Sequence, residues 1–234
     1  MKKSLPTAVL GRTGLLVTRL GYGTAHRRPM TDNHAKALLR MVVDSGINFI
    51  DTADDYGNSE ELIGKHLSHR RSEYYLATKC CGSESGANHI WTTENAFYTL
   101  EQSLRRLKTD YVDAMQLHNP TVKECEEGGL VQALQKMRQQ GKVRWIGVST
   151  TLPHLPTFLK WGLFDVFQIP YSALERDHED WITKSAEAGV GIILRGGVAL
   201  GMPGTGLGKP ELWRKFDEAG IDELREEAES PTAF

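Results

Sequence analysis

The sequence lacks the features that mark several large classes of protein. Its three cysteines, Cys80, Cys81 and Cys125, show no C-x-x-C spacing, so we expect neither disulfides nor a zinc site. No apolar run approaches the roughly 20 residues that span a bilayer. The basic start is interrupted at Pro6 and Arg12, too early for a signal peptide. These absences predict a protein of the reducing cytoplasm that has no membrane partner.

Charge of one sign is not in excess either. The chain carries 28 Lys and Arg against 30 Asp and Glu, a formal net charge of −2, and its few arginine pairs are interpreted as solvated surface. We therefore expect no nucleic-acid partner. The content of 40% apolar and 25% charged residues is typical of a globular protein, and 234 residues suffice for one α/β barrel.

What the sequence does contain is a regular alternation of short β-like runs and amphipathic helical runs. The β-like runs are 19–23, 48–52, 74–79, 111–118, 143–149, 165–169 and 191–195. The clearest helical runs lie around 38–43, 97–107 and 130–137, the second after possible caps at Thr92 and Thr93 and the third before Gly141. Seven successive β-α units predict a parallel sheet, because a parallel crossover needs a helix.

Two architectures compete for such a pattern. A doubly wound dinucleotide-binding sheet should carry G-x-G-x-x-G after its first strand, but after Gly21 and Gly23 the third position is His26. The glycine-rich stretch 201–208 also lacks the spacing of a phosphate-binding P-loop. The pattern therefore favours a (β/α)8 TIM barrel.

One strand of that barrel is missing from the pattern. At the observed spacing an eighth would begin near or beyond residue 235, whereas the chain ends after a helical run through Leu212, Phe216, Ile221 and Leu224. We expect one domain over residues 1–234 that is truncated at its C-terminal side, as a shortened chain, a cleaved fragment or a shorter variant. Its open parallel edges would encourage self-association.

Ionisable residues collect where the predicted strands end, which is where barrel enzymes build their active sites. Asp51, Lys79 and His118 end three adjacent strands, and Tyr56 follows the first of them. This set suits carbonyl reduction, in which Tyr56 supplies a proton. A lysine ammonium about 4 Å away would lower the tyrosine pKa from about 10 by roughly three units. Asp51 would hold Lys79 in place, and His118 would donate a hydrogen bond to the carbonyl oxygen.

Each of these residues also has an ordinary structural explanation. Asp51 could cap a turn, Tyr56 could be a loop aromatic, Lys79 could extend to water, and His118 could be a satisfied residue at a strand end. Their joint occurrence at successive strand ends favours the chemical interpretation.

Six segments of the chain resemble the aldo-keto reductase family. They are LGRTGLLVTRLGYGT (10–24), GINFIDTADDYGNSEELIG (46–64), LATK (76–79), DYVDAMQLHNP (110–120), GKVRWIGVST (141–150) and FQIPYSALER (167–176). The resemblance covers nearly the whole chain. It implies an oxidoreductase that uses NADPH/NADP+ to reduce aldehydes or ketones, with Asp51, Tyr56, Lys79 and His118 as catalytic tetrad and Tyr56 as general acid.

The resemblance also implies how the cofactor is held. Ser149 and Gln168 would hold the nicotinamide carboxamide, Gly23 and Thr24 would lie beside its ribose, and Asp51 would belong to the cofactor-binding set as well. NADPH would be favoured over NADH. The substrate would be a small carbonyl compound, selected by the loops at 26–30, at 80–91 and after residue 195.

Three departures from the family pattern matter. Thr150 stands where members generally carry Asn, so one carboxamide contact is in question. Arg195 stands where many members place an aromatic residue; it could lie against the nicotinamide, bind a phosphate or an acidic substrate, or be a surface residue. The C-terminal grip on the adenosine phosphate would lie beyond residue 234, and the run 196–210 could wrap the pyrophosphate or be a flexible loop.

These departures leave rival functions open. A barrel that binds NADP(H) as a sensor or regulatory subunit, or an inactive fragment, fits the missing C-terminal part. Another barrel activity, such as an isomerase or lyase, fits less well, because the sequence pairs Tyr56 with Lys79 and has no clear metal-ligand cluster.

Overall fold

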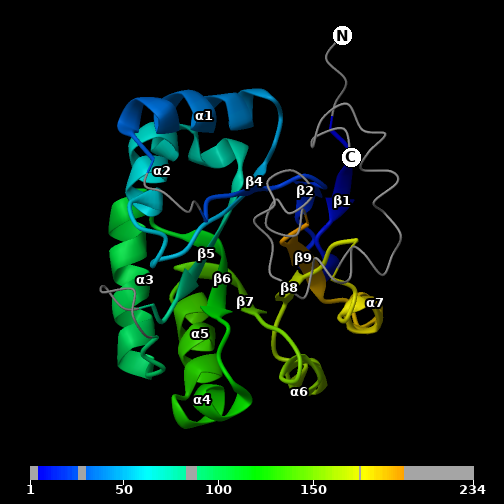
Figure 1. Cartoon of the computed structure of the whole chain (residues 1–234). Helices are drawn as coiled ribbons and strands as arrows, with labels where there is room; N and C mark the ends of the chain where they lie inside the picture. Colours follow the sequence, from blue (N-terminus) through cyan, green and yellow to red (C-terminus); the bar gives the residue numbers. More distant parts are fainter. Residues whose placement is uncertain (1–4, 26–29, 83–88, 174, 198–234) are drawn as a thin grey trace, which may run out of the picture.

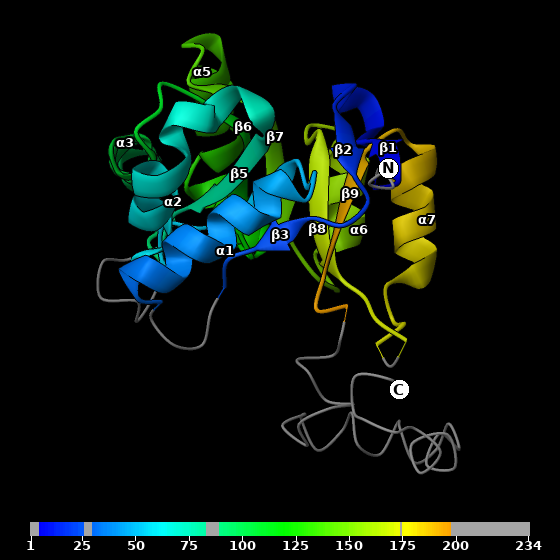
Figure 2. The same ribbon diagram turned by 90° about the horizontal axis from the view of Figure 1, so that it is seen from above.

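A curved sheet of seven parallel strands organises the described part of the chain, which comprises residues 5–25, 30–82, 89–173 and 175–197 of this computed structural model. The strands are β3 (Tyr22–Gly23), β4 (Phe49–Asp51), β5 (Tyr75–Cys80), β6 (Val112–His118), β7 (Val143–Ser149), β8 (Val166–Pro170) and β9 (Gly191–Arg195). They are hydrogen-bonded in chain order, and every neighbouring pair is parallel. Figures 1 and 2 show the sheet curling into a half-barrel with helices outside it. The predicted incomplete (β/α)8 barrel with seven strands is confirmed.

The strand bounds agree closely with the sequence pattern. Strands β7 and β9 begin and end at the predicted residues; β6 differs from the prediction by one residue at its start, and β4, β5 and β8 differ by one residue at each end. Only β3 is clearly shorter than the predicted run 19–23. The Arg19 N–H donates to the Pro6 carbonyl oxygen (2.8 Å), so the first part of that run pairs with the N-terminal segment instead.

That N-terminal segment forms an antiparallel hairpin that the sequence pattern did not predict. Strands β1 (Thr7–Val9) and β2 (Leu16–Thr18) pair around a 3-10 turn, η1 (Gly11–Thr13). The hairpin lies beside β9 in Figures 1 and 2, and the Arg12 N–H donates to the Gly189 carbonyl oxygen at 2.7 Å. Gly11 has a φ of +49°, and a Cβ there would meet backbone atoms of Gly191 at 2.3 Å. Only glycine therefore allows this close approach.

Helices cover the outer face of the sheet. They are α1 (Asp32–Asp44), α2 (Ser59–Leu67), α3 (Thr93–Leu107), α4 (Val122–Glu127), α5 (Leu130–Gln139), α6 (Leu155–Trp161) and α7 (Glu179–Glu187), with a 3-10 segment, η2 (Ser68–Glu73), after α2. Threonines begin three of them, since Thr31, Thr92 and Thr121 each accept a hydrogen bond from a backbone N–H in the first turn. Thr92, not Thr93, is thus the cap of α3.

The helices bury one apolar face each against the strands. Leu39, Leu100, Leu134 and Phe158 of four different helices are at most 3% exposed and belong to the main core cluster. Full burial of such a side chain stabilises the fold by about 1.5–3 kcal/mol. Among the described helices none is long and apolar enough to cross a membrane. The predicted helical run through Leu212 and most of the run 196–210 lie outside the described residues.

Candidate active site

Three polar side chains end adjacent strands at one edge of the sheet. Asp51 is the last residue of β4, Lys79 the next to last of β5 and His118 the last of β6. The strands are parallel and in register, with Asp51 opposite Ala77 and Lys79 opposite Gln116. The carboxyl ends of the strands therefore bring together the residues that the sequence predicted to converge.

Lys79 and Asp51 form a buried ion pair. The Lys79 Nζ lies 2.7 Å from the Asp51 Oδ2 and donates a second hydrogen bond to the Thr52 carbonyl oxygen at 2.9 Å. Lys79 is fully buried, and such burial lowers the pKa of a lysine. Burial is the largest single influence, but the charge of Asp51, the neighbouring Tyr56 and the hydrogen bonds to both together outweigh it, so the pKa of Lys79 lies above its ordinary value. The ammonium is therefore kept charged inside the protein.

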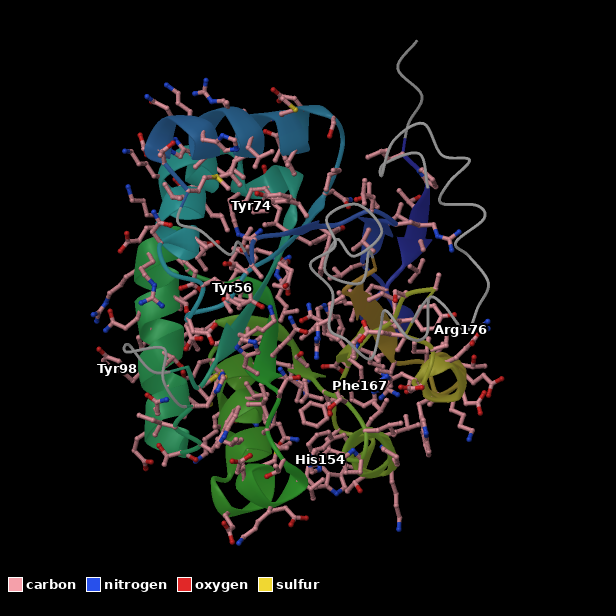
Figure 3. The ribbon with its side chains drawn as sticks, viewed as in Figure 1. Tyr56, Tyr74, Tyr98, His154, Phe167 and Arg176 are labelled. Atoms are coloured by element: carbon pink, nitrogen blue, oxygen red, sulfur yellow. The ribbon has the colours of Figure 1, made fainter. Side chains whose placement is uncertain are left out.

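Tyr56 lies beside this pair, in the loop between β4 and α2 (Figure 3). The Lys79 Nζ is 4.7 Å from the centre of its ring, and the His118 ring approaches it edge-on with centres 5.7 Å apart. Burial raises the pKa of Tyr56 above 10, although the Lys79 charge opposes this shift. The expectation that Lys79 brings this pKa down toward neutrality is therefore wrong for this structure, because it left out the cost of burying a phenolate.

His118 contacts a carboxylate that the sequence reasoning did not place in the site. The His118 Nδ1 lies 3.2 Å from the Asp55 Oδ2, and the same oxygen lies 3.5 Å from the His89 Nε2. Burial is the largest single influence and would raise the pKa of Asp55, but the contacts with His118 and His89 and a backbone hydrogen bond together hold the pKa below its ordinary value. Asp55 is therefore an anion between two imidazoles.

The residues that the sequence predicts to contact the carboxamide lie at the ends of β7 and β8, next to the end of β9. Ser149 lies opposite Gln168, both are buried, and the Thr150 N–H donates to the Gln168 carbonyl oxygen at 3.0 Å. The Ser149 Oγ donates to the Asn119 Oδ1 at 3.1 Å, and the same oxygen accepts from the Arg195 Nη2 at 3.4 Å. Arg195 is thus drawn inward over the strand ends. Burial lowers its pKa below the ordinary value.

Gly23 and Thr24 adjoin Asp51 on the other side. Gly23 lies opposite Asp51 in the sheet, and both the N–H and the Oγ1 of Thr24 donate to the Asp51 carbonyl oxygen, at 3.0 and 3.1 Å. A Cβ at Gly23 would meet no described atom within 4 Å. This end of β3 is therefore accessible to a ligand.

Sequence reasoning missed four polar residues of this region: Gln116, Asp55, His89 and Asn119. Gln116 donates to the Asp51 Oδ1 at 3.0 Å, and its position two residues before His118 on the same strand would have predicted this face. Asn119 adopts a positive φ of 62° directly after the strand. Nothing in the sequence pattern distinguished Asp55 from Asp54, or pointed to His89.

An apolar cavity opens beside Tyr56. Its volume is about 360 Å³, and it lies between the end of β3 and helices α1 and α2. Tyr56 and Asp55 reach its wall, and Leu39, Leu62 and Ile63 supply much of the remaining lining. The site thus combines a charged pair, a buried phenol and an imidazole with apolar space next to them.

Comparison with known proteins agrees with this geometry. The model of the aldo/keto reductase family matches residues 19–206. The chain is 30% identical to an uncharacterized oxidoreductase, YqkF, from Bacillus subtilis, covering 82% of this chain and 65% of that protein. It is 32% identical to L-galactose dehydrogenase from Arabidopsis thaliana, covering 86% of this chain and 68% of the relative.

The fold is also similar to solved structures. Aldo-keto reductase AKR11C1 from Bacillus halodurans, in its holo form, superposes with a TM-score of 0.78 at 31% identity, covering 86% of this chain and 69% of that one. The chain thus spans about two thirds of the length of these relatives, between 65% and 69%. With the parallel half-barrel and the residues at its strand ends, these matches show that the chain belongs to the aldo/keto reductase family.

Proposed function

We propose that the protein is an NADPH-dependent oxidoreductase that reduces aldehydes or ketones to alcohols, with Tyr56 as general acid. The observation that carries this proposal is the buried Lys79–Asp51 ion pair directly beside the Tyr56 ring, with Nζ 4.7 Å from the ring centre. Burying a lysine and a carboxylate as a charged pair costs desolvation energy and adds little net stability. A role in acting on a neighbouring group therefore explains the pair better than stability does. Tyr56 is that neighbour.

Proton donation follows from the electrostatics of the Tyr56 phenol. Because burial raises its pKa, the phenol is protonated at neutral pH and holds the proton that a developing alkoxide needs. Once the proton has left, the phenolate faces the Lys79 ammonium. A pair of opposite charges about 4 Å apart attracts by about 4 kcal/mol at an effective dielectric constant near 20. Lys79 thus stabilises the deprotonated tyrosine, and Asp51 keeps Lys79 charged.

His118 would orient the carbonyl group. Its ring lies edge-on to Tyr56, so an oxygen accepting the Tyr56 proton is within reach of the imidazole. Asp55 contacts Nδ1, which leaves Nε2 as the ring nitrogen that can donate to the carbonyl oxygen. A second donor beside Tyr56 stabilises the negative charge that develops on that oxygen.

The described residues fit a nicotinamide cofactor. A carboxamide needs both donors and acceptors, and the ends of β7 and β8 offer the Ser149 hydroxyl and the Gln168 amide side by side. Gly23, Thr24, Thr150 and Arg195 would complete the surface on which the ring and its ribose rest. When bound, the nicotinamide supplies the hydride. The preference for NADPH over NADH rests on the family resemblance.

We also infer a cytoplasmic location and a small carbonyl compound as the partner of this site. The three cysteines are free and buried, as in a reducing compartment, and this supports the location.

We also infer a tendency to self-associate. It is supported by strands β3 and β9, because each has only one neighbouring strand within the described sheet.

The test is turnover of NADPH with a panel of aldehydes and ketones, followed by the loss of NADPH absorbance. Wild type should consume NADPH, and Tyr56→Phe should lower kcat/KM at least about 100-fold, because it removes the proton donor. Tyr98→Phe is the matched control, since Tyr98 lies on α3, 47% exposed and away from Tyr56 in Figure 3.

Two results would contradict the proposal. If Tyr56→Phe is as active as wild type, Tyr56 is not the acid. If wild type binds NADPH, as seen by quenching of tryptophan fluorescence, but reduces no carbonyl compound, the protein is a cofactor-binding or regulatory barrel.

A further inference from the structure

Three potential metal ligands converge at the mouth of the half-barrel. The Asp55 Oδ2 lies 3.2 Å from the His118 Nδ1 and 3.5 Å from the His89 Nε2, and one ligand atom of each residue lies within 4.8 Å of the other two. The two imidazole rings are close, with centres 4.9 Å apart. Within residues 5–25, 30–82, 89–173 and 175–197, no other group of His, Cys, Asp and Glu converges in this way.

The charged contacts of Asp55 with the two imidazoles explain this convergence only in part. The His118 Nδ1, the His89 Nε2 and the Asp55 Oδ1 are all buried atoms that make no hydrogen bond to another described group. Buried polar atoms are otherwise almost always satisfied. A cation between the three side chains would satisfy the two nitrogens through their lone pairs and the carboxylate through its charge.

The chemistry of the three ligands selects the kind of cation. Two imidazoles and one carboxylate suit borderline transition ions, of which Zn²⁺ is the commonest, whereas Mg²⁺ and Ca²⁺ prefer oxygen ligands. Ligands about 2.0–2.1 Å from a tetrahedral Zn²⁺ lie about 3.3 Å from one another. The two contacts of Asp55, at 3.2 and 3.5 Å, bracket this separation.

Ring contacts hold the two imidazoles in place. The His89 ring stacks on Trp91 with centres 4.9 Å apart, and His118 is flanked by Tyr56. The side chains of Asp55, His89 and His118 are 17%, 31% and 13% exposed, so the cluster lies near the surface although its candidate ligand atoms are buried. Three protein ligands and an open position are characteristic of accessible zinc sites.

We propose that Asp55, His89 and His118 form a binding site for one Zn²⁺ ion at the mouth of the half-barrel. The cysteine spacing gave no reason to expect a metal site, and the three ligands lie far apart in the chain, so only the fold brings them together. The proposal goes beyond the reductase function and does not depend on it, because binding is measured without turnover. It also makes His118 a residue shared by two sites.

Isothermal titration of the full chain with Zn²⁺, after dialysis against a chelator, tests the proposal. Wild type should bind one ion per chain, and His89→Ala should weaken the affinity at least tenfold. The matched control is His34→Ala, an exposed histidine on α1, which should bind like wild type. Absence of binding to folded wild type, or equal affinity in His89→Ala, would overturn the proposal.

A second measurement keeps the test decisive if His89→Ala folds poorly. Titration of wild type with Co²⁺ should give the visible absorption bands of a four-coordinate site, which Asp55→Asn should lose. A strong near-ultraviolet thiolate band would instead assign the ion to cysteine and overturn the proposal. Zn²⁺ should also raise the Tm of wild type and leave that of Asp55→Asn unchanged; equal shifts in both would contradict the assignment.

Discussion

Removal of the Asp51 charge should destabilise the protein strongly and in a pH-dependent way. Asp51→Asn leaves the Lys79 ammonium, which is fully buried, without its counter-charge at 2.7 Å. Breaking a buried pair by removal of one partner costs about 3–5 kcal/mol. That is a large part of a total stability of about 5–15 kcal/mol, so the variant should still fold but with a small margin.

The pH dependence follows from the direction of the Lys79 pKa. In wild type this pKa is raised in the folded state, so the contribution of Lys79 is fully present below the unfolded pKa and is lost only as pH rises through the folded pKa. Between pH 6 and 9 it is therefore constant. In Asp51→Asn the charge that most strongly opposes the effect of burial is gone, so the folded-state pKa of Lys79 should fall below the unfolded value. The unfolded state then binds more protons, and the variant becomes more stable as pH rises.

Urea unfolding at pH 6, 7.5 and 9 measures both effects. The deficit of Asp51→Asn relative to wild type should be largest at pH 6 and smallest at pH 9. Glu127→Gln is the control, because it removes an exposed pair with Lys123 at 3.8 Å and should cost less than about 0.5 kcal/mol. A deficit for Asp51→Asn below about 1 kcal/mol, or one that is the same at pH 6 and 9, would refute the argument.

Two further predictions concern packing and a second buried charge. Gly64→Ala should lower the free energy of unfolding by about 1–3 kcal/mol, because its Cβ would clash with the Arg106 carbonyl oxygen. Gly197→Ala is the control: its Cβ would meet no described atom within 4 Å, so it should change the free energy by less than about 0.5 kcal/mol. Equal urea midpoints for the two variants would sink this reasoning. Asp113→Ala should cost about 3–5 kcal/mol in the same assay, because Asp113 is 1% exposed and pairs with the half-buried Arg71 at 2.6 Å, and a loss under about 1 kcal/mol would contradict it.

The parallel sheet was predictable because its strands are buried on both faces. Such strands appear as short blocks of Val, Ile, Leu and aromatic residues, and this is why β6 and β8, which are buried almost throughout, lie within one residue of the predicted bounds. The β1–β2 hairpin was not predictable in this way. Its strands are three residues long and β1 is exposed throughout, so neither a buried block nor an alternation marks them.

The candidate site was predictable as far as strand ends determine it. Asp51 and His118 are the last residues of their strands and Lys79 is the next to last, so a parallel sheet brings all three to one edge. Asp55 and His89 lie in loops, whose paths follow no periodic pattern, and their contact with His118 is visible only in the structure. The direction of the Tyr56 pKa shift was predicted wrongly. The sequence suggests that Lys79 lies near Tyr56, but it does not show how deeply Tyr56 is buried, and burial decides the direction.

Deuterium transfer tests the central claim most directly. Wild type would be incubated with an aldehyde or ketone that it reduces and with NADPH deuterated at both C4 positions, and the alcohol would be examined by mass spectrometry. The account predicts deuterium on the former carbonyl carbon, and loss of this product in Tyr56→Phe but not in Tyr98→Phe. An alcohol without deuterium, or full labelling by Tyr56→Phe, would contradict hydride transfer from the cofactor with Tyr56 as the acid.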